Sequence, residues 1–293
     1  MVNFLGLEPE YSGLSQSRYC IYTVPFERTT TYGKGTGFGP EAILIASQQV
    51  ELYDEELNAE PFRSGIATHP GLRFPADKPT ETCFAEITDQ VVSLLDEDRF
   101  VIGLGGEHSV SFSLIRAYRQ KYPQLTILQL DAHADLRQSY RGSPLNHACV
   151  MARIHEMVPA VGIGIRSLSR QEADLIRRER LPVWFACRMR EDAGWEEEAL
   201  AAVQEPVYVT IDVDFFDPSI MPATGTPEPG GFFWRETLRF LRKLFSAKQV
   251  VGFDVMELAP QANFHAADFL TAKLVYKLIG YHQMKLSSVT AKE

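Results

Sequence analysis

Short, continuous apolar runs separated by stretches of helical spacing constrain the fold of this chain more than any other feature. Their length and composition are typical of strands that are buried on both faces. Strands are expected at Tyr19–Val24, Phe100–Leu104, Leu125–Leu130, Val161–Ile165, Val183–Ala186, Val207–Val213 and Val250–Val255. Buried strands that alternate with helices predict an α/β fold with a mostly parallel sheet covered on both faces.

Helices between these strands are indicated by apolar spacing and by helix-end signals. They are expected over about Glu41–Val50, behind Pro40, and over Phe84–Leu95, Val110–Lys121 and Ala266–Leu278. We expect the last helix to end before Gly280 and to pack on the outside of the protein.

The composition limits the size and the partners of the folded chain. Its 293 residues are 45% hydrophobic and 23% charged, which suits one large α/β domain or two smaller ones. A formal net charge of −9 argues against nucleic acid or an anionic membrane surface as the main partner. A cationic small molecule is compatible with this charge.

The lack of a recognisable targeting signal and the spacing of the cysteines favour a cytoplasmic location. The N-terminal MVNFLGLEPEYSG does not resemble a signal peptide, and no run of about 18 apolar residues would span a bilayer. The four cysteines are far apart and form no CxxC pair, which favours reduced thiols over disulfides.

Acidic residues and histidines stand where several of the expected strands end. Since the carboxyl ends of parallel strands share one edge of a sheet, these side chains are expected along one rim. The group consists of His108 with Glu107, then Asp131, His133 and Asp135, then Asp212 and Asp214, and finally Asp254 and Glu257. For a single DxD, unrelated caps and surface ion pairs would be the better explanation, but recurrence at successive strand ends favours a site.

This residue set favours a pair of divalent cations. Residues i and i+2 of a strand point to one side, so Asp212 and Asp214 are expected to converge, as are Asp131, His133 and Asp135 if the extended geometry continues beyond the strand. Clustered carboxylates repel one another unless cations neutralise them. Four carboxylates and two imidazoles without a thiolate favour manganese ahead of zinc. Two such ions about 3.5–4 Å apart would lower the pKa of a bridging water.

The glycine-rich stretches do not indicate a nucleotide site. Neither GKGTGFGP (Gly33–Pro40) nor GLGGEH (Gly103–His108) fits GxGxxG, and GxxxxGK[ST] is absent from the chain. We expect these glycines to permit tight turns around a pocket.

Four motifs in order resemble the signatures of the ureohydrolase family, the arginases and agmatinases. They are GGEHS (Gly105–Ser109), DAHAD (Asp131–Asp135), DVDFFDP (Asp212–Pro218) followed by ATGTPEPGG (Ala223–Gly231), and DVMELAP (Asp254–Pro260). TTTYGKGTGFGPEAIL (Thr29–Leu44) is similar to the bacterial agmatinase branch. The similarity runs collinearly over roughly residues 20–280 and implies a single ureohydrolase domain over residues 1–293.

The resemblance implies a three-layer α/β/α fold, two manganese ions per subunit and hydrolysis of a guanidino group to urea and an amine. One manganese would be held by His108, Asp131, Asp135 and Asp212, and the other by Asp131, His133, Asp212 and Asp214. Asp131 and Asp212 would bridge the two ions. The strand-end pattern selects the same six side chains.

Further site residues are also implied by the resemblance. Glu257 would bind the guanidinium through charge-assisted hydrogen bonds, and His147 would carry a proton to the leaving amine. Thr226 would steady the substrate or Glu257, although a simple turn residue is the competing interpretation. Asn146 closes the loop Leu136–Asn146, which is expected to contact the far end of the substrate.

Agmatine is the favoured substrate, with urea and putrescine as products and hence a role in polyamine biosynthesis. His147-Ala148 stands where arginases typically carry HG, and SPLNHACV (143–150) resembles agmatinases. Arg137 and Arg141 leave arginine and guanidinobutyrate open, and aminopropylagmatine also stays open. A metal-dependent deacetylase is the alternative from another class, which the paired acids disfavour. The resemblance also implies a homo-oligomer, a trimer or hexamer.

Overall fold

One parallel sheet forms the centre of the protein. The computed structural model describes residues 2–290, with side chains described through residue 286. Within that part the strands follow the order β2-β1-β3-β8-β7-β4-β5-β6, and every pairing is parallel. They are β1 (Tyr19–Val24), β2 (Ile66–His69), β3 (Phe100–Gly105), β4 (Thr126–Leu130), β5 (Ala160–Ile165), β6 (Val183–Phe185), β7 (Val207–Asp212) and β8 (Val250–Met256).

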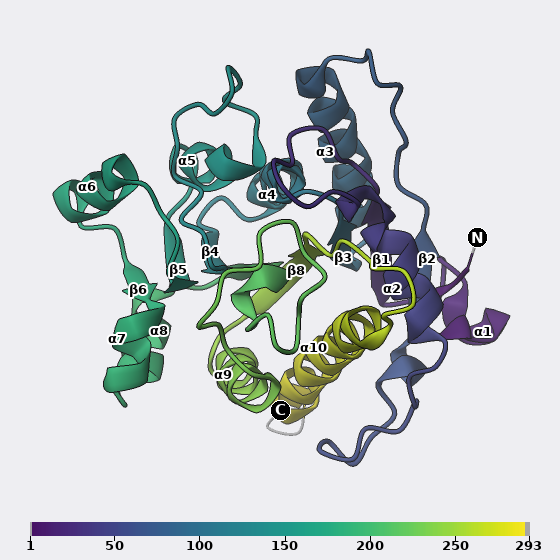
Figure 1. Cartoon of the computed structure of the whole chain (residues 1–293). Coiled ribbons are helices and arrows are strands. Elements are labelled where there is room, and N and C mark those ends of the chain that lie inside the picture. Colours follow the sequence, from purple (N-terminus) through teal and green to yellow (C-terminus); the bar gives the residue numbers. More distant parts are fainter. Residues whose placement is uncertain (1, 291–293) are drawn as a thin grey trace.

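Helices cover both faces of this sheet (Figure 1). One apolar core joins the strands to α3 (Thr80–Asp96), α4 (Ser111–Lys121) and α5 (Val150–His155). The other joins them to α2 (Gly39–Ser47), α9 (Trp234–Ala247) and α10 (Ala266–Thr290). The remaining helices are α1 (Pro9–Ser12), α6 (Arg170–Glu179), α7 (Ala186–Glu191) and α8 (Trp195–Ala202). The predicted three-layer α/β/α fold with a mostly parallel sheet is confirmed.

The expected strands all occur, and their ends differ from the predicted ends by no more than one residue. The edge strand β2 was not predicted, because its sequence IATH contains only two apolar residues and gives no clear strand signal. None of the described helices is long and apolar enough to cross a membrane.

The prediction for the last helix is wrong in its C-terminal end. The helix α10 does not stop before Gly280 but continues to Thr290. A Cβ atom on Gly280 would lie 2.4 Å from Leu57 Cδ1, so this glycine allows close packing. Leu274 and Tyr276 are fully buried, because α10 packs against α2 and α9 as well as the sheet.

The glycines of GLGGEH also serve close packing. None of them has a positive φ. A Cβ atom on Gly106 would lie 2.0 Å from the carbonyl oxygen of Phe26, in the segment that follows β1. The expectation of tight turns is therefore wrong for this stretch: its glycines let neighbouring backbone and side chains approach the end of β3.

Candidate metal centre

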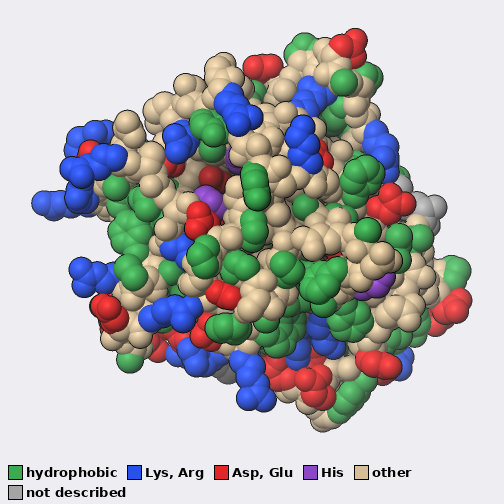
Figure 2. Space-filling view, in the orientation of Figure 1, with side chains coloured by type: hydrophobic (Ala, Val, Ile, Leu, Met, Phe, Trp, Pro, Cys, Tyr) green, Lys and Arg blue, Asp and Glu red, His purple; other side chains and the backbone are tan. Residues whose placement is uncertain are grey.

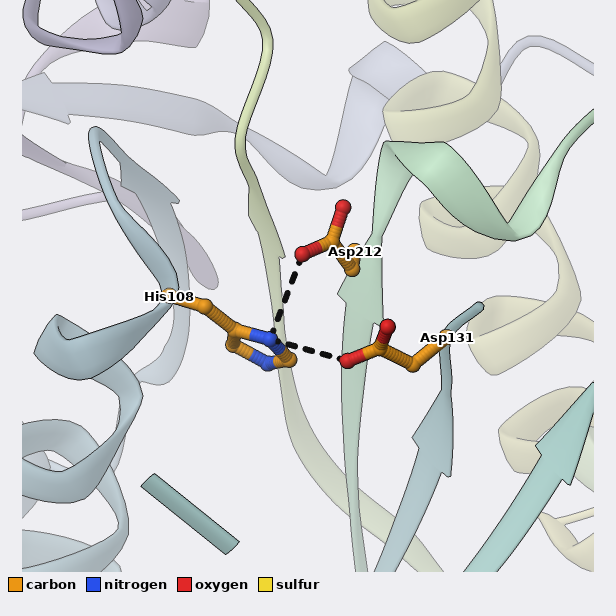
Figure 3. Close-up of side chains that lie close together, drawn as sticks. All are labelled: His108, Asp131 and Asp212. Carbon is orange, nitrogen blue, oxygen red and sulfur yellow. Dashed lines mark ion pairs between the residues drawn. The ribbon is translucent and has the colours of Figure 1, made fainter. Parts of the chain in front are cut away.

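Four neighbouring strands deliver acidic residues and histidines to one rim of the sheet. β3, β8, β7 and β4 are consecutive in the sheet order. His108 and Glu257 follow β3 and β8, Asp212 is the last residue of β7, and Asp131 follows β4 directly. Figure 3 shows His108, Asp131 and Asp212 pointing toward a common point. The site thus lies where open α/β sheets bind ligands.

The first cluster surrounds Nδ1 of His108. This atom lies 3.1 Å from Asp131 Oδ2, 3.3 Å from Asp212 Oδ2 and 3.4 Å from Asp135 Oδ2. It is buried and makes no hydrogen bond of acceptable geometry. On the other side of the ring, Nε2 lies 2.9 Å from Thr210 Oγ1, whose hydroxyl donates to Asp254.

These contacts fix the His108 tautomer. Because the Thr210 hydroxyl gives its proton to Asp254, it accepts from Nε2–H of His108, so that Nδ1 is the ring nitrogen that can offer a lone pair to a cation. A buried lone pair facing three carboxylates is a donor set that a divalent cation satisfies. The residues therefore fit the metal that the sequence motifs predict.

The second cluster is built on His133. Its Nδ1 lies 2.8 Å from Asp214 Oδ2 and 3.8 Å from Asp131 Oδ1. Asp131 thus turns one oxygen toward each histidine and belongs to both groups of side chains able to hold a metal ion. Asp212 belongs to the first group alone. Asp135 belongs to neither group, although its carboxylate lies near His108.

Two ligand candidates converge for a different reason from the predicted one. The strand β4 ends at Leu130, and Asp135 has a left-handed φ of +51°. Asp214 lies in the 3-10 turn Val213–Phe215, where its backbone N–H donates to Asp212 Oδ1 at 2.9 Å. The expectation that strand alternation aligns these residues is wrong, since turns after the strands orient them.

Burial and mutual repulsion shift the pKa values of the clustered groups. Burial, with Asp214 and Asp135 adding to it, raises the pKa of Asp131 to about 7. Burial also raises the pKa of Asp212 well above its usual value. Burial opposes protonation of His133, but the carboxylates around it, foremost Asp214, raise its pKa to about 11. The cluster therefore attracts positive charge, which bound divalent cations would supply.

Glu257 lies beside the first cluster in a constrained backbone conformation. Its φ is +66°, a left-handed value that side chains other than glycine seldom adopt. The backbone N–H of Glu257 donates to Gly106, and its Oε1 accepts from the backbone N–H of His108 at 2.7 Å. Burial, opposed by this hydrogen bond, raises the pKa of Glu257 well above its usual value. One carboxylate oxygen is thus anchored beside the metal candidates.

A cavity of about 260 Å³ opens over the two clusters. His133, Asp135, Asp212, Asp214, Glu257, His147, Thr226 and Arg137 are among its lining residues. Figure 2 shows acidic and histidine side chains inside a hollow on this face of the molecule. The cavity thus combines both metal candidates with the residues predicted to act on the substrate.

The loop Leu136–Asn146 contributes only part of its residues to the cavity. Arg137 and Tyr140 line it, with the Arg137 guanidinium 5.0 Å from the centre of the Tyr140 ring. Asn146 does not line the cavity: its side chain accepts from the N–H of Ala148 at 3.1 Å and caps the turn that carries His147. Asn146 is therefore placed to hold His147 in position, away from the substrate space.

Sequence reasoning missed several polar side chains of the site. Gln129 donates to Asp131, and Thr224 lines the cavity with a buried hydroxyl that has no hydrogen-bond partner. Thr224 belongs to the same TGTP motif as Thr226, and this motif could have identified Thr224 from the sequence. Thr29, which contacts both Glu107 and His147, belonged to a recognised motif, but these long-range contacts left no sequence signal.

Comparison with known proteins gives concordant matches over almost the whole chain. The family model described as the arginase family matches residues 17–280. An N(1)-aminopropylagmatine ureohydrolase of Synechocystis sp. is 43% identical over 268 residues, covering 89% of this chain and 88% of that protein. An agmatinase of Pyrococcus horikoshii is 35% identical over 270 residues, with coverage of 91% and 93%.

The solved structures agree with the sequence matches. The crystal structure of agmatine ureohydrolase of Thermoplasma volcanium superimposes with a TM-score of 0.88 at 26% identity. The match covers 98% of this chain and 96% of that one.

Proposed function

The chain belongs to the arginase family, as a ureohydrolase acting on guanidino compounds, and we propose that it is a manganese enzyme whose substrate is aminopropylagmatine. The products would be urea and the corresponding triamine. The observation that carries the proposal is the pair of Asp/His clusters sharing Asp131 beneath a cavity that also contains Glu257 and His147.

Two manganese ions would be held by the side chains gathered at the strand ends. One would bind His108, Asp131, Asp135 and Asp212, and the other Asp131, His133, Asp212 and Asp214. When bound, these cations neutralise the carboxylates and acidify water, which makes hydrolysis feasible near neutral pH.

Glu257 is suited to bind the guanidinium. Its Oε1 is occupied by the backbone N–H of His108, which orients the carboxylate and leaves Oε2 for the substrate. A guanidinium is planar and cationic, so a fixed carboxylate oxygen both attracts it and orients its carbon. Thr224 and Thr226 lie along the same cavity wall and would add hydroxyl contacts.

His147 is placed to transfer the proton that the leaving amine requires. It lines the cavity, and burial lowers its pKa, so that its imidazole is neutral near neutral pH. A neutral imidazole can take up the proton that the attacking water loses and deliver it to the departing nitrogen.

The surroundings of Arg137 in the cavity disfavour a substrate with a carboxylate tail. Arg137 is the one arginine or lysine among the described residues that line the cavity, and its Nε lies 3.8 Å from Glu172 Oε2. An arginine beside a buried carboxylate is a weak partner for a second carboxylate, so arginine and guanidinobutyrate are disfavoured. We put aminopropylagmatine ahead of agmatine, the second candidate, and the similarity to aminopropylagmatine ureohydrolases supports this order.

A substrate panel tests this proposal. Urea release by the manganese-loaded chain would be measured with aminopropylagmatine, agmatine, arginine and guanidinobutyrate, and acetate release with an acetylated polyamine. We expect urea from the first two, with the higher kcat/KM for aminopropylagmatine. If agmatine had the higher kcat/KM, it would become the first candidate and aminopropylagmatine the second. Acetate release without urea from any guanidine would overturn the proposal in favour of a deacetylase.

A further inference from the structure

A fully buried carboxylate, Glu107, joins the loop after β3 to the loop after β1. Its Oε2 accepts from the backbone N–H groups of Arg28 and Thr29, at 2.5 and 2.6 Å. Its Oε1 accepts from the hydroxyls of Thr29 and Ser109, at 2.8 and 2.5 Å. Glu107 is 0% exposed, and these four donors are the described hydrogen-bond partners of its carboxylate. The carboxylate therefore holds Thr29 by both its backbone and its side chain.

The Thr29 hydroxyl also contacts His147 twice. Its Oγ1 accepts from the His147 backbone N–H at 3.1 Å and lies 3.0 Å from His147 Nδ1. A hydroxyl has one proton to donate and two lone pairs to accept with. Since the proton goes to the Glu107 carboxylate, which cannot donate in return, the second lone pair must accept from Nδ1–H of His147. The contacts thus select the tautomer with its proton on Nδ1.

The other ring nitrogen of His147 is left for the cavity. Among the described residues, no group forms a hydrogen bond with Nε2, and His147 lines the cavity over the two clusters. The Tyr140 ring meets the imidazole edge to face, with ring centres 6.1 Å apart. The imidazole is thus bound by Thr29 at Nδ1 and packs against the Tyr140 ring. Its unprotonated Nε2 is left for the substrate.

We propose that Thr29 and Glu107 are positioning residues that hold His147 in the tautomer needed for proton transfer. The inference rests on the proposed function, in which His147 carries a proton between water and the leaving amine. Nε2 gains the proton that the attacking water loses and gives it to the departing nitrogen, while Nδ1 keeps its proton throughout. In the imidazolium state the positive charge is stabilised through the Thr29 hydroxyl by the Glu107 carboxylate, as in other carboxylate-oriented histidines.

Removing the hydroxyl from Thr29 tests this arrangement kinetically. Thr29→Val keeps the shape of the side chain, and we expect kcat to fall by about 10- to 100-fold with KM little changed, since proton transfer by a positioned group is worth that much or more. Thr29→Ser restores a hydroxyl, and its kcat is expected to stay within about 3-fold of the wild type. A Thr29→Val enzyme with wild-type kcat would overturn the proposal.

A double-mutant cycle separates positioning from general damage to the fold. In a His147→Asn background there is no imidazole to orient, so adding Thr29→Val is expected to change kcat by less than about 2-fold. An equal loss of kcat in both backgrounds would mean that Thr29 acts independently of His147, and the proposal would be wrong. Manganese content measured for each variant shows whether a loss of activity reflects loss of metal.

The tautomer of His147 can also be determined by a measurement that does not depend on enzyme activity. Nitrogen-15 NMR of the histidine-labelled full chain, loaded with diamagnetic Zn²⁺, would identify His147 as the signal missing in His147→Asn. We expect a protonated Nδ1 and an unprotonated Nε2 in the wild type, and a mixture of tautomers in Thr29→Val. A proton on Nε2 in the wild type would overturn the proposal. This result stands even if the wild type releases no urea, in which case the proposed function fails separately.

Discussion

Gln129 donates through Nε2 to Oδ2 of Asp131 at 2.8 Å, across the point where β4 ends. The same amide nitrogen donates to the carbonyl of His133 at 3.1 Å, so one buried side chain holds both the carboxylate and the loop that follows it. Oδ2 is also the oxygen that faces His108. Gln129 therefore fixes the orientation of the carboxylate common to both clusters, as hydrogen bonds to metal ligands commonly do.

Replacing Gln129 by leucine should weaken manganese binding. The apolar side chain keeps similar bulk but removes the hydrogen bond to Oδ2 of Asp131, and loss of such a contact typically costs about 10- to 100-fold in metal affinity. Isothermal titration calorimetry with Mn²⁺ would measure the change, with the exposed Gln249→Leu as a matched control. Equal affinities of both variants would show that Gln129 does not support the site.

Glu257→Gln should weaken substrate recognition while leaving the metal content unchanged. The amide retains the size of the carboxyl group but lacks the charge that attracts a guanidinium. A hydrogen bond to a charged group contributes about 1.5–3 kcal/mol, so kcat/KM should fall by roughly 10- to 100-fold. Steady-state kinetics of urea release, with metal analysis of the same samples, would check this. An unchanged kcat/KM would remove Glu257 from the binding site.

Gly106→Ala should destabilise the fold near the site. The new methyl group would lie 2.0 Å from the Phe26 carbonyl oxygen, which is itself held by the backbone N–H of Glu107. Overpacking of this kind typically costs about 1–3 kcal/mol. In Gly37→Ala the new Cβ atom would lie 3.4 Å from its nearest neighbour, so the melting temperature of that variant should be close to that of the wild type. Thermal unfolding of both variants compares them, and similar melting temperatures would contradict the packing argument.

His282 should make the stability of the protein fall in mild acid. Burial, with Arg18 adding to it, lowers the pKa of His282 from 6.5 to about 4, and its Nδ1 lies 2.9 Å from the Tyr19 hydroxyl. Above pH 6.5 the residue is neutral in both the folded and the unfolded state and contributes no pH dependence. Between pH 6.5 and 4 the unfolded chain binds a proton that the folded chain does not, so stability decreases as pH falls.

The measurement is the free energy of unfolding at pH 7 and pH 5 for the wild type and His282→Gln. At about 1.4 kcal/mol for each pH unit, the loss between these pH values should be about 2 kcal/mol smaller in the variant. Equal losses in both proteins would show that His282 does not titrate in this way.

The sequence predicted the strands and the side chains at their ends because buried parallel strands leave an unbroken apolar signal. His108, Asp131 and Asp212 lie together since they follow or end neighbouring strands, an arrangement that short apolar runs and parallel topology are enough to indicate. Apolar runs and parallel topology do not predict the left-handed backbone of Asp135 or the turn that carries Asp214.

Long-range polar contacts could not be predicted from the sequence either. Thr29 lies 78 residues from Glu107 and 118 from His147, and no periodicity links residues so far apart. The cap formed by Asn146 is local, yet Asn146 was predicted to bind the substrate because the loop Leu136–Asn146 was expected to contact the far end of the substrate. Motifs identify which segments form the site, whereas the contacts within it depend on the packing of whole loops.

Urea release by Asp131→Asn compared with the wild type, both loaded with manganese and assayed with aminopropylagmatine and agmatine, tests the central claim most directly. Asp131 belongs to both clusters, and the amide removes the negative charge on which both depend. We predict urea from the wild type and a loss of at least about 100-fold in the variant, since both proposed metal positions lose a ligand. Full activity in Asp131→Asn would contradict the account.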